Sequence, residues 1–212
     1  MSGFFGCVSR KECVADVFYG TDYHSHLGTR RGGMVLFDKK EGFQRQIHNI
    51  ENTPFRTKFE RDLADFRGHA GLGCISDSDP QPLLVRSHLG LYAIVTVGII
   101  NNTDELVKAY LSDKGQQFLT LSSGRVNVTE LTAALINQEN DLVSGILHAM
   151  EVIDGSMTIL ILTEEGELIA ARDSMGRLPV LIGQREDGYC VSFESFAYHK
   201  LDYQDAYELG PR

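Results

Sequence analysis

The segment Leu91-Tyr-Ala-Ile-Val-Thr-Val-Gly-Ile-Ile100 decides how this chain is expected to fold. It is a long run of β-branched and other apolar residues without proline or charge, which is typical of a central strand buried on both faces. Shorter apolar strands are predicted before it, over residues 3–9, 34–37, 43–50, 70–76 and 83–86, and after it, over 156–163, 168–172, 179–183 and 189–193. The centre of the molecule is therefore predicted to be β-sheet.

Helical patterns surround this segment. Residues 13–24 and 57–66 are predicted to be helices, and three more begin near Thr103, Asn127 and Asn140. The second of these three opens with a capping-box sequence, Asn127-Val-Thr-Glu130. Residues 26–33, with three glycines, are predicted to be a loop. Because strands and helices occur in separate blocks, the sequence predicts one α+β domain over residues 1–212, with antiparallel sheets and helices on the outer faces.

Composition narrows the class of protein. Hydrophobic residues make up 42% of the chain, charged residues 23%, and the net charge is −9, which suits a soluble globular protein and disfavours nucleic acid as a partner. No apolar run reaches the ~20 residues of a membrane span. Arg10, Lys11 and Glu12 come too early for a signal peptide. We therefore expect a cytoplasmic protein without a membrane partner.

The cysteines do not indicate a metal site. Cys7, Cys13, Cys74 and Cys190 form neither a CxxC pair nor a zinc-finger spacing. They stand among apolar or small residues, so we expect buried, free thiols and predict no metal and no cofactor.

Several short motifs, in order along the chain, carry a family resemblance. The start, Ser2-Gly3-Phe4-Phe5-Gly6, resembles the Cys-Gly-x-x-Gly that opens the class II glutamine amidotransferases. Further similar segments are Gly68–Leu84 with its Gln-Pro turn, Leu89–Asn102, Thr129-Glu130-Leu131, Ala171-Arg172-Asp173-x-x-Gly176-Arg177-x-Pro179, and Phe193-Glu194-Ser195. The likeness spans nearly the whole chain and is closest to the amidophosphoribosyltransferase branch, which acts in purine biosynthesis. It implies a four-layer αββα sandwich of two antiparallel sheets, the N-terminal nucleophile hydrolase fold.

The resemblance also implies a reaction, the hydrolysis of glutamine to glutamate and ammonia. In the family the nucleophile is the thiol of the first residue after the initiator methionine, and that residue's own α-amine, with a pKa near ~8, is the base. Here Ser2 occupies the nucleophile position. A serine hydroxyl ionises far less readily than a thiol, so Ser2 is predicted to be a poor nucleophile even after removal of Met1.

Other positions of the implied site also depart from the family. The oxyanion pair Asn-Gly aligns with Val97-Gly98, so one side-chain donor is lost. The arginine that binds the glutamine carboxylate aligns with Ser76, beside Asp77, and the family's His-Arg-Gly reads His26-Leu27-Gly28. The aspartate that binds the α-amine aligns with Val128. These losses predict a pseudoenzyme that no longer hydrolyses glutamine and has a structural or regulatory role.

The expected partner is a phosphoribosyltransferase domain, in the same chain or in a partner chain; a homo-oligomer is left open. The chain ends at Leu209-Gly-Pro-Arg212, near where the family's linker starts, and nothing in it resembles the loop that binds phosphoribosyl pyrophosphate.

Two alternatives remain. In the first, Ser2 is an active nucleophile on another amide, with Arg30 or Arg31 as the carboxylate clamp. In the second, the pocket senses a metabolite through Arg30, Arg31 and the histidines His24 and His26. The simplest interpretation of the two arginines is a pair in surface salt bridges.

Overall fold

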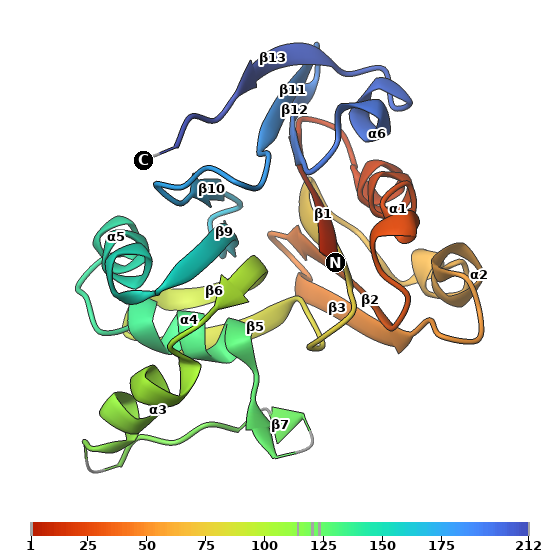
Figure 1. The fold of residues 1–212 in the computed structure, drawn as a ribbon. Helices are drawn as coiled ribbons and strands as arrows, with labels where there is room; N and C mark the ends of the chain where they lie inside the picture. Colours follow the sequence, from red (N-terminus) through yellow and green to blue (C-terminus); the bar gives the residue numbers. More distant parts are fainter. Residues whose placement is uncertain (1, 114, 120, 123, 212) are drawn as a thin grey trace.

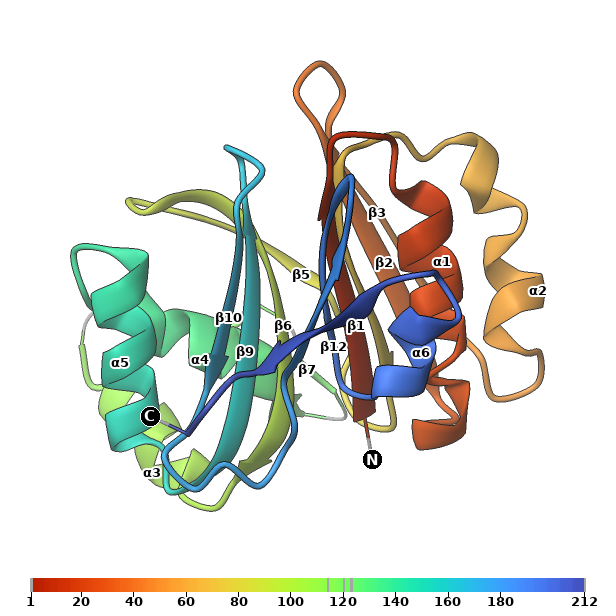
Figure 2. The same cartoon turned by 90° about the horizontal axis from the view of Figure 1, so that it is seen from above.

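Two antiparallel sheets face each other in the centre of the molecule (Figures 1 and 2). The structure is a computed structural model that describes residues 2–113, 115–119, 121–122 and 124–211. Within these residues, one sheet has seven strands in the order β13 (Gln204–Glu208), β11 (Leu181–Arg185), β12 (Gly188–Ser192), β1 (Ser2–Ser9), β4 (Ala70–Ser76), β2 (Arg31–Asp38) and β3 (Gly42–Asn49). The other has four, in the order β10 (Leu168–Arg172), β9 (Gly155–Thr163), β6 (Gly90–Ile100) and β5 (Leu83–Ser87).

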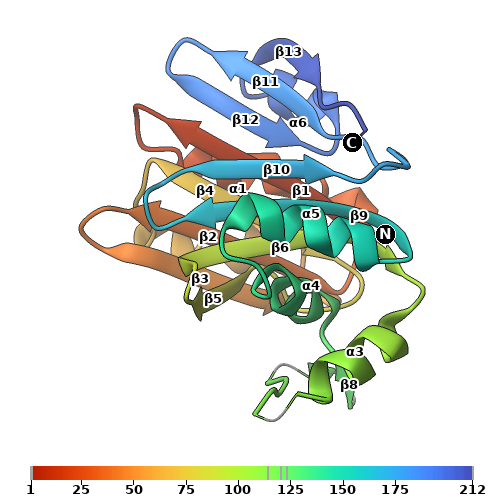
Figure 3. The same ribbon diagram turned by 90° about the vertical axis from the view of Figure 1, so that its left-hand side faces the viewer.

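Helices cover the outer face of each sheet, so the molecule has four layers (Figure 2). The seven-stranded sheet carries α1 (Val14–Asp22), α2 (Phe55–Phe59) and α6 (Ser195–His199). The four-stranded sheet is covered by α4 (Val128–Ile136) and α5 (Leu142–Val152), and α3 (Thr103–Leu111) packs beside α4. A small hairpin, β7 (Leu121–Ser122) and β8 (Arg125–Val126), projects near α3 (Figure 3). The predicted α+β class and αββα sandwich are confirmed.

The alternation of side chains along the strands separates three apolar cores. On β1, Phe4 points between the sheets whereas Phe5 points toward the helices on the other face, and both are fully buried. The inter-sheet core also includes Leu72 of β4, Val95 of β6 and Leu160 of β9. The predicted central strand, β6, lies between β5 and β9 and is buried on both faces through most of its length, as expected.

The predicted loop over residues 26–33 is wrong in part. Ser25–Leu27 form a 3₁₀ turn, and Arg31 already begins strand β2. The glycines serve close packing here: a Cβ at Gly33 would lie 1.7 Å from the carbonyl oxygen of Gln81, and one at Gly32 would lie 2.6 Å from Cδ2 of Phe55. Glycine is therefore required because neighbouring groups approach the strand, not because the chain turns.

The predicted helix over residues 57–66 is also corrected. Helix α2 ends at Phe59, and a separate 3₁₀ turn covers Asp62–Ala64. The carboxylate of Asp62 lies 2.6 Å from Nε2 of His48 on β3, and this contact holds the second turn against the sheet edge. Helix α6, strand β13 and the β7–β8 hairpin had no prediction.

The predicted N-cap of α4, at Asn127, is confirmed. The Asn127 carboxamide oxygen accepts hydrogen bonds from the backbone N–H groups of Thr129 at 2.8 Å and Glu130 at 3.2 Å. Its amide nitrogen donates to the carbonyl of Pro80 at 3.3 Å, which ties the β4–β5 loop to the helix. The fully buried Asn127 thus satisfies the helix end and positions a loop.

All four cysteines are free and buried, as expected. Burial raises the pKa of Cys74 to about 12, so its thiol stays protonated at neutral pH. No helix in the part of the chain that the structure describes has the length and apolar character to cross a membrane.

We predict that Leu160→Ala lowers the free energy of unfolding by about 2–5 kcal/mol, because it opens a cavity in the inter-sheet core. Leu84→Ala is the matched control, since Leu84 on β5 is 37% exposed and its loss leaves little cavity. Urea denaturation monitored by circular dichroism measures both. Equal effects of the two substitutions would contradict the assignment of Leu160 to the core.

Candidate functional site

Loops and strand ends from both sheets enclose a cavity of about 520 Å³ at one end of the sandwich. The start of β1 contributes Ser2, the end of β6 contributes Gly98, and the start of β9 contributes Ser156. The lining residues are Ser2, Asp77, Ser78, Val97, Gly98, Ile99, Asn101, Gly155, Ser156, Arg177, Leu178 and Phe193. The cavity combines hydroxyl, amide and charged groups with an apolar wall, as small-molecule sites commonly do.

Ser2 lies at the edge of this cavity, half-buried. Its cross-strand neighbour on β4 is Ser76, whose neighbour on the other side is Arg31 of β2. Directly opposite residues share one face of a sheet, and Phe4 two residues further along β1 points between the sheets. Ser2, Ser76 and Arg31 therefore face the inter-sheet space in one row. Met1 lies outside the described residues.

The Ser76 hydroxyl is used within its own loop. Ser76 is 1% exposed, and its Oγ accepts a hydrogen bond from the backbone N–H of Ser78 at 3.1 Å. The next residue, Asp77, accepts from the backbone N–H of Thr29 at 2.6 Å, which links the loop to the segment before β2. A carboxylate ligand would therefore meet no cation at position 76 and an anion at position 77.

Val97 and Gly98 both line the cavity, and each has a distinct packing role. Val97 is 6% exposed and belongs to the inter-sheet core. A Cβ at Gly98 would lie 1.9 Å from the carbonyl oxygen of Ser156, so glycine is needed for the approach of β9. At this position the structure therefore has a close backbone approach at Gly98 and a buried alkyl side chain at Val97.

Val128 does not reach the cavity within the described residues. It is the first residue of α4, and its backbone N–H donates to the carboxylate of Asp79 at 3.0 Å. The neighbouring amide of Asn127 is occupied by the helix cap and by Pro80. Neither residue offers a free group for an α-amine.

Leu27 and Gly28 lie next to the start of β1 but outside the cavity lining. Leu27 is 8% exposed, and its Cδ1 would lie 2.7 Å from a Cβ placed on Gly3, so it packs directly against the start of β1. Buried Gly28 follows it in extended conformation. Both residues support the strand that carries Ser2 and are not among the residues that line the cavity.

The remaining basic candidates point elsewhere. Arg30 is exposed, with its Nε 3.9 Å from Oε1 of Glu51, a surface ion pair as the simplest interpretation predicted. His26 lies 2.9 Å from the carboxylate of Glu194. His24 is fully buried, with Nδ1 2.7 Å from the Gly20 carbonyl and Nε2 accepting from the Glu194 backbone N–H at 3.3 Å. Among the described residues these side chains do not converge on the cavity.

Among the described residues that line the cavity, the cation is Arg177, which the sequence did not single out as a pocket residue. It is exposed and follows an anchored turn, in which Asp173 accepts from the backbone N–H groups of Met157 at 2.6 Å and Gly176 at 2.9 Å. Arg172 supports the same turn by donating to the Gly176 carbonyl. The sequence motif around Arg177 could have pointed to this part of the cavity. No motif pointed to Gly155 and Ser156, which reach the cavity because β9 pairs with β6.

This fold, with a strand-end cavity at Ser2, defines an N-terminal nucleophile hydrolase-like domain, and comparison with known proteins gives its family. The family model described as glutamine amidotransferase domain matches residues 70–198, and the chain belongs to that family.

Curated relatives include amidophosphoribosyltransferases of Methanocaldococcus jannaschii, 27% identical over 100% of this chain and 46% of the relative, and of Bacillus subtilis, 28% identical over 92% and 41%. A solved structure of the B. subtilis glutamine phosphoribosylpyrophosphate amidotransferase, complexed with ADP and GMP, superposes with a TM-score of 0.85 at 27% identity, over 99% of this chain and 45% of that one. The domain is thus homologous to the N-terminal domain of amidophosphoribosyltransferase, and the chain spans less than half the length of these relatives.

Burial of His24 predicts a pH dependence of stability. Loss of solvent around the ring lowers the pKa of His24 from 6.5 to about 4, so the folded state holds it neutral. The unfolded chain takes up a proton below pH 6.5 and the folded chain only near pH 4, so stability falls on acidification across that window, by about 3 kcal/mol in full.

Urea denaturation at pH 7.5 and pH 4.5 measures this effect. In His24→Asn the loss between the two pH values should be smaller than in the wild type, because the titrating ring is gone. The same loss in both proteins would show that other groups cause it.

Proposed function

We propose that this domain is a catalytically silent glutamine amidotransferase domain of the amidophosphoribosyltransferase type, with a structural or regulatory role. The observation that carries the proposal is the lining of the cavity at Ser2, which lacks the side chains that the family resemblance implies for glutamine hydrolysis. A serine stands at the nucleophile position, and Val97 presents a buried alkyl group where an oxyanion donor is implied.

The contacts around the cavity support this proposal. Ser76 is 1% exposed and hydrogen-bonded inside its own loop, so it cannot replace an arginine clamp. Val128 and Asn127 serve the start of α4. Loss of one oxyanion donor alone typically costs about 100–1,000-fold in rate, and here the nucleophile and the carboxylate clamp differ as well.

The proposed partner is a phosphoribosyltransferase domain, in the same or a partner chain. The relatives, named amidophosphoribosyltransferases, are more than twice as long as the segment that this chain matches. The phosphoribosyltransferase domain would use free ammonia or ammonia supplied from elsewhere. The amidotransferase domain would stabilise or regulate that partner domain. Reading the gene beyond Arg212 and testing copurification of the two domains would examine this directly.

We predict that the purified domain hydrolyses glutamine no faster than its Ser2→Ala variant, and that Ser2→Cys alone does not restore turnover. Ser2→Cys combined with Val97→Asn and Ser76→Arg should exceed Ser2→Cys by about 100-fold or more, because a donor and a clamp return together. Ammonia release measures the rates.

Intact mass restricts the comparison to protein without Met1, because a retained methionine blocks the α-amine. The melting temperature confirms that each variant is folded. Wild-type turnover that Ser2→Ala abolishes would overturn the silent assignment and favour the alternative of an active serine amidohydrolase.

A metabolite-binding role for the same cavity is a second candidate, favoured by one observation. Arg177 is exposed at a cavity of about 520 Å³ that also holds Asn101, Ser78 and Ser156. This cation stands apart from Arg30 and Arg31, the side chains first considered for a sensor. A small carboxylate would suit such a combination of a guanidinium and neutral donors.

We predict that a dicarboxylate or amino acid that raises the thermal stability of the wild type does not stabilise Arg177→Ala. A ligand at 100 times its Kd stabilises by about 2.7 kcal/mol, which thermal shift detects readily. L-glutamate and succinate are the first probes, and Lys108→Ala on the exposed face of α3 is the control. A shift that survives in Arg177→Ala places the ligand elsewhere.

A further inference from the structure

A second cavity opens at the other end of the sandwich. Its volume is about 600 Å³, and it lies where β1 ends, β2 ends, β4 begins and β9 turns into β10. Ser2 and Ser9 are the two ends of β1, so roughly 25 Å separates the two sites at the usual rise of a strand. In Figure 2 the β2–β3 hairpin and the β9–β10 turn lie at the end of the sheets opposite the N-terminus.

The walls of this second cavity are of two kinds. Its floor is apolar and lies between the sheets, made of Val8, Phe37 and Ala70. The Gly166 turn rests on the ring of Phe37, where a Cβ on that glycine would lie 3.6 Å from Cδ1. Its rim carries Arg10, Lys39, Lys40 and His69, all exposed.

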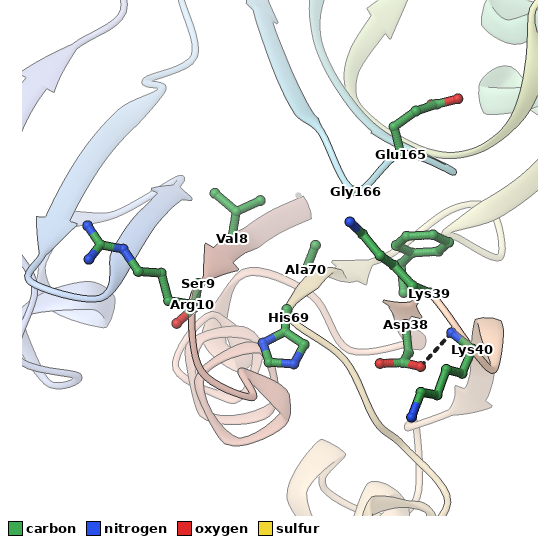
Figure 4. Close-up of a pocket in the computed structure, with 11 residues that line it drawn as sticks. Val8, Ser9, Arg10, Asp38, Lys39, Lys40, His69, Ala70, Glu165 and Gly166 are labelled. Atoms are coloured by element: carbon green, nitrogen blue, oxygen red, sulfur yellow. Dashed lines mark hydrogen bonds between the residues drawn. The ribbon is translucent and has the colours of Figure 1, made fainter.

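The basic side chains of the rim are available to a ligand. In the described part of the chain, no ion pair or side-chain hydrogen bond is found for Arg10, Lys39 or Lys40, although acidic residues outnumber basic ones by 29 to 20 in the sequence. Figure 4 shows Lys39 reaching across the opening toward the Glu165–Gly166 turn, with His69 on the facing rim, whereas the side chains of Arg10 and Lys40 start at the rim and extend outward from it. In an acidic protein, unpaired cations around one cavity create a local positive potential.

Two carboxylates also border the cavity, and they act differently. Asp38 accepts hydrogen bonds from the backbone N–H groups of Lys40 at 2.8 Å and Glu41 at 3.2 Å, so it shapes the turn that presents the lysines. These two bonds hold the pKa of Asp38 below its usual range. Glu165 is exposed on the opposite turn and opposes an anion. Three cationic side chains and a histidine still exceed the two carboxylates.

We propose that this cavity, which we call the distal cavity, binds a small phosphate monoester with an apolar body. Lys39 and His69 would hold the phosphoryl dianion at the rim, and the exposed Arg10 side chain would turn inward to join them. The apolar body would pack against Phe37 and Val8 on the floor. The site is independent of Ser2 and of the function proposed for the first cavity, so either proposal can fail without the other.

Phenyl phosphate is the probe, because it joins a phosphate monoester to an apolar ring. Titration of the whole chain, followed by amide NMR shifts at constant ionic strength, should give saturable changes at Ser9–Arg10, Phe37–Lys40, His69 and Gly166. Inorganic phosphate, which lacks the ring, should bind more weakly. Benzyl alcohol, which lacks the charge, should not compete.

Charge variants test the rim. Lys39→Glu and Arg10→Glu should each weaken phenyl phosphate binding by about tenfold or more, the usual size of a lost charge-assisted contact. Glu165→Gln should strengthen it several-fold, because it removes an opposing charge. Lys200→Glu, an exposed lysine after α6, is the matched control and should leave affinity unchanged.

Three outcomes would overturn the proposal. The first is no saturable shift up to roughly 10 mM probe. The second is an equal loss in Lys200→Glu, which would show a general charge effect. The third is binding to anionic lipid vesicles without binding to phenyl phosphate, which would assign the basic rim to a membrane surface.

Discussion

The packing of the two sheets against each other is the constraint on which the rest of the structure depends. Phe4, Leu72, Val95 and Leu160 are fully buried between the sheets, and burial of this kind contributes about 25 cal/mol per Å² of apolar surface. Because this core fixes how β1 lies across β6 and β9, it brings the start of β1 to the ends of the other two strands. The cavity at Ser2 is a consequence of that packing, as is the distal cavity where the end of β1 lies near the β9–β10 turn.

Close backbone approach lets the sheets and loops keep these positions. Because Gly98 has no side chain, β9 can run beside the end of β6. In the same way, Gly33 lets the Gln81 carbonyl pack directly against the backbone of β2. Gln81 is buried, and its Oε1 accepts from the backbone N–H of Thr96 at 2.8 Å, so one loop joins the two sheets. The path of the backbone is thus specified by contacts that do not require glutamine. A family fold can persist through such contacts when its site residues change, since function resides in the site and not in the fold.

Much of the fold could be predicted from the sequence because apolar runs end at clear turn signals. Strands β4 and β10 have the predicted bounds, and Asn127 caps α4 as its capping-box pattern indicates. Strand β13 could not be predicted, because Gln204–Glu208 is an edge strand with every residue exposed and no apolar alternation. The site was predictable only where a motif pointed to it, as at Ser2, Val97 and Gly98. Gly155 and Ser156 enter through the strand pairing, which no local pattern encodes.

The positions that we propose have lost a glutamine-binding group share one physical property. A site that hydrolyses glutamine must keep polar groups desolvated and without partners inside the protein, and each such group costs about 1–3 kcal/mol of stability. Here Val97 joins the inter-sheet core, Leu27 packs beneath the start of β1, and the Ser76 hydroxyl accepts a bond from its own loop. Each of these residues is satisfied within the fold and needs no ligand to complete it. In the proposed loss of hydrolysis, side chains that would bind substrate are exchanged for side chains that stabilise the domain. Val97→Asn should therefore lower the stability of the domain even though it restores a hydrogen-bond donor.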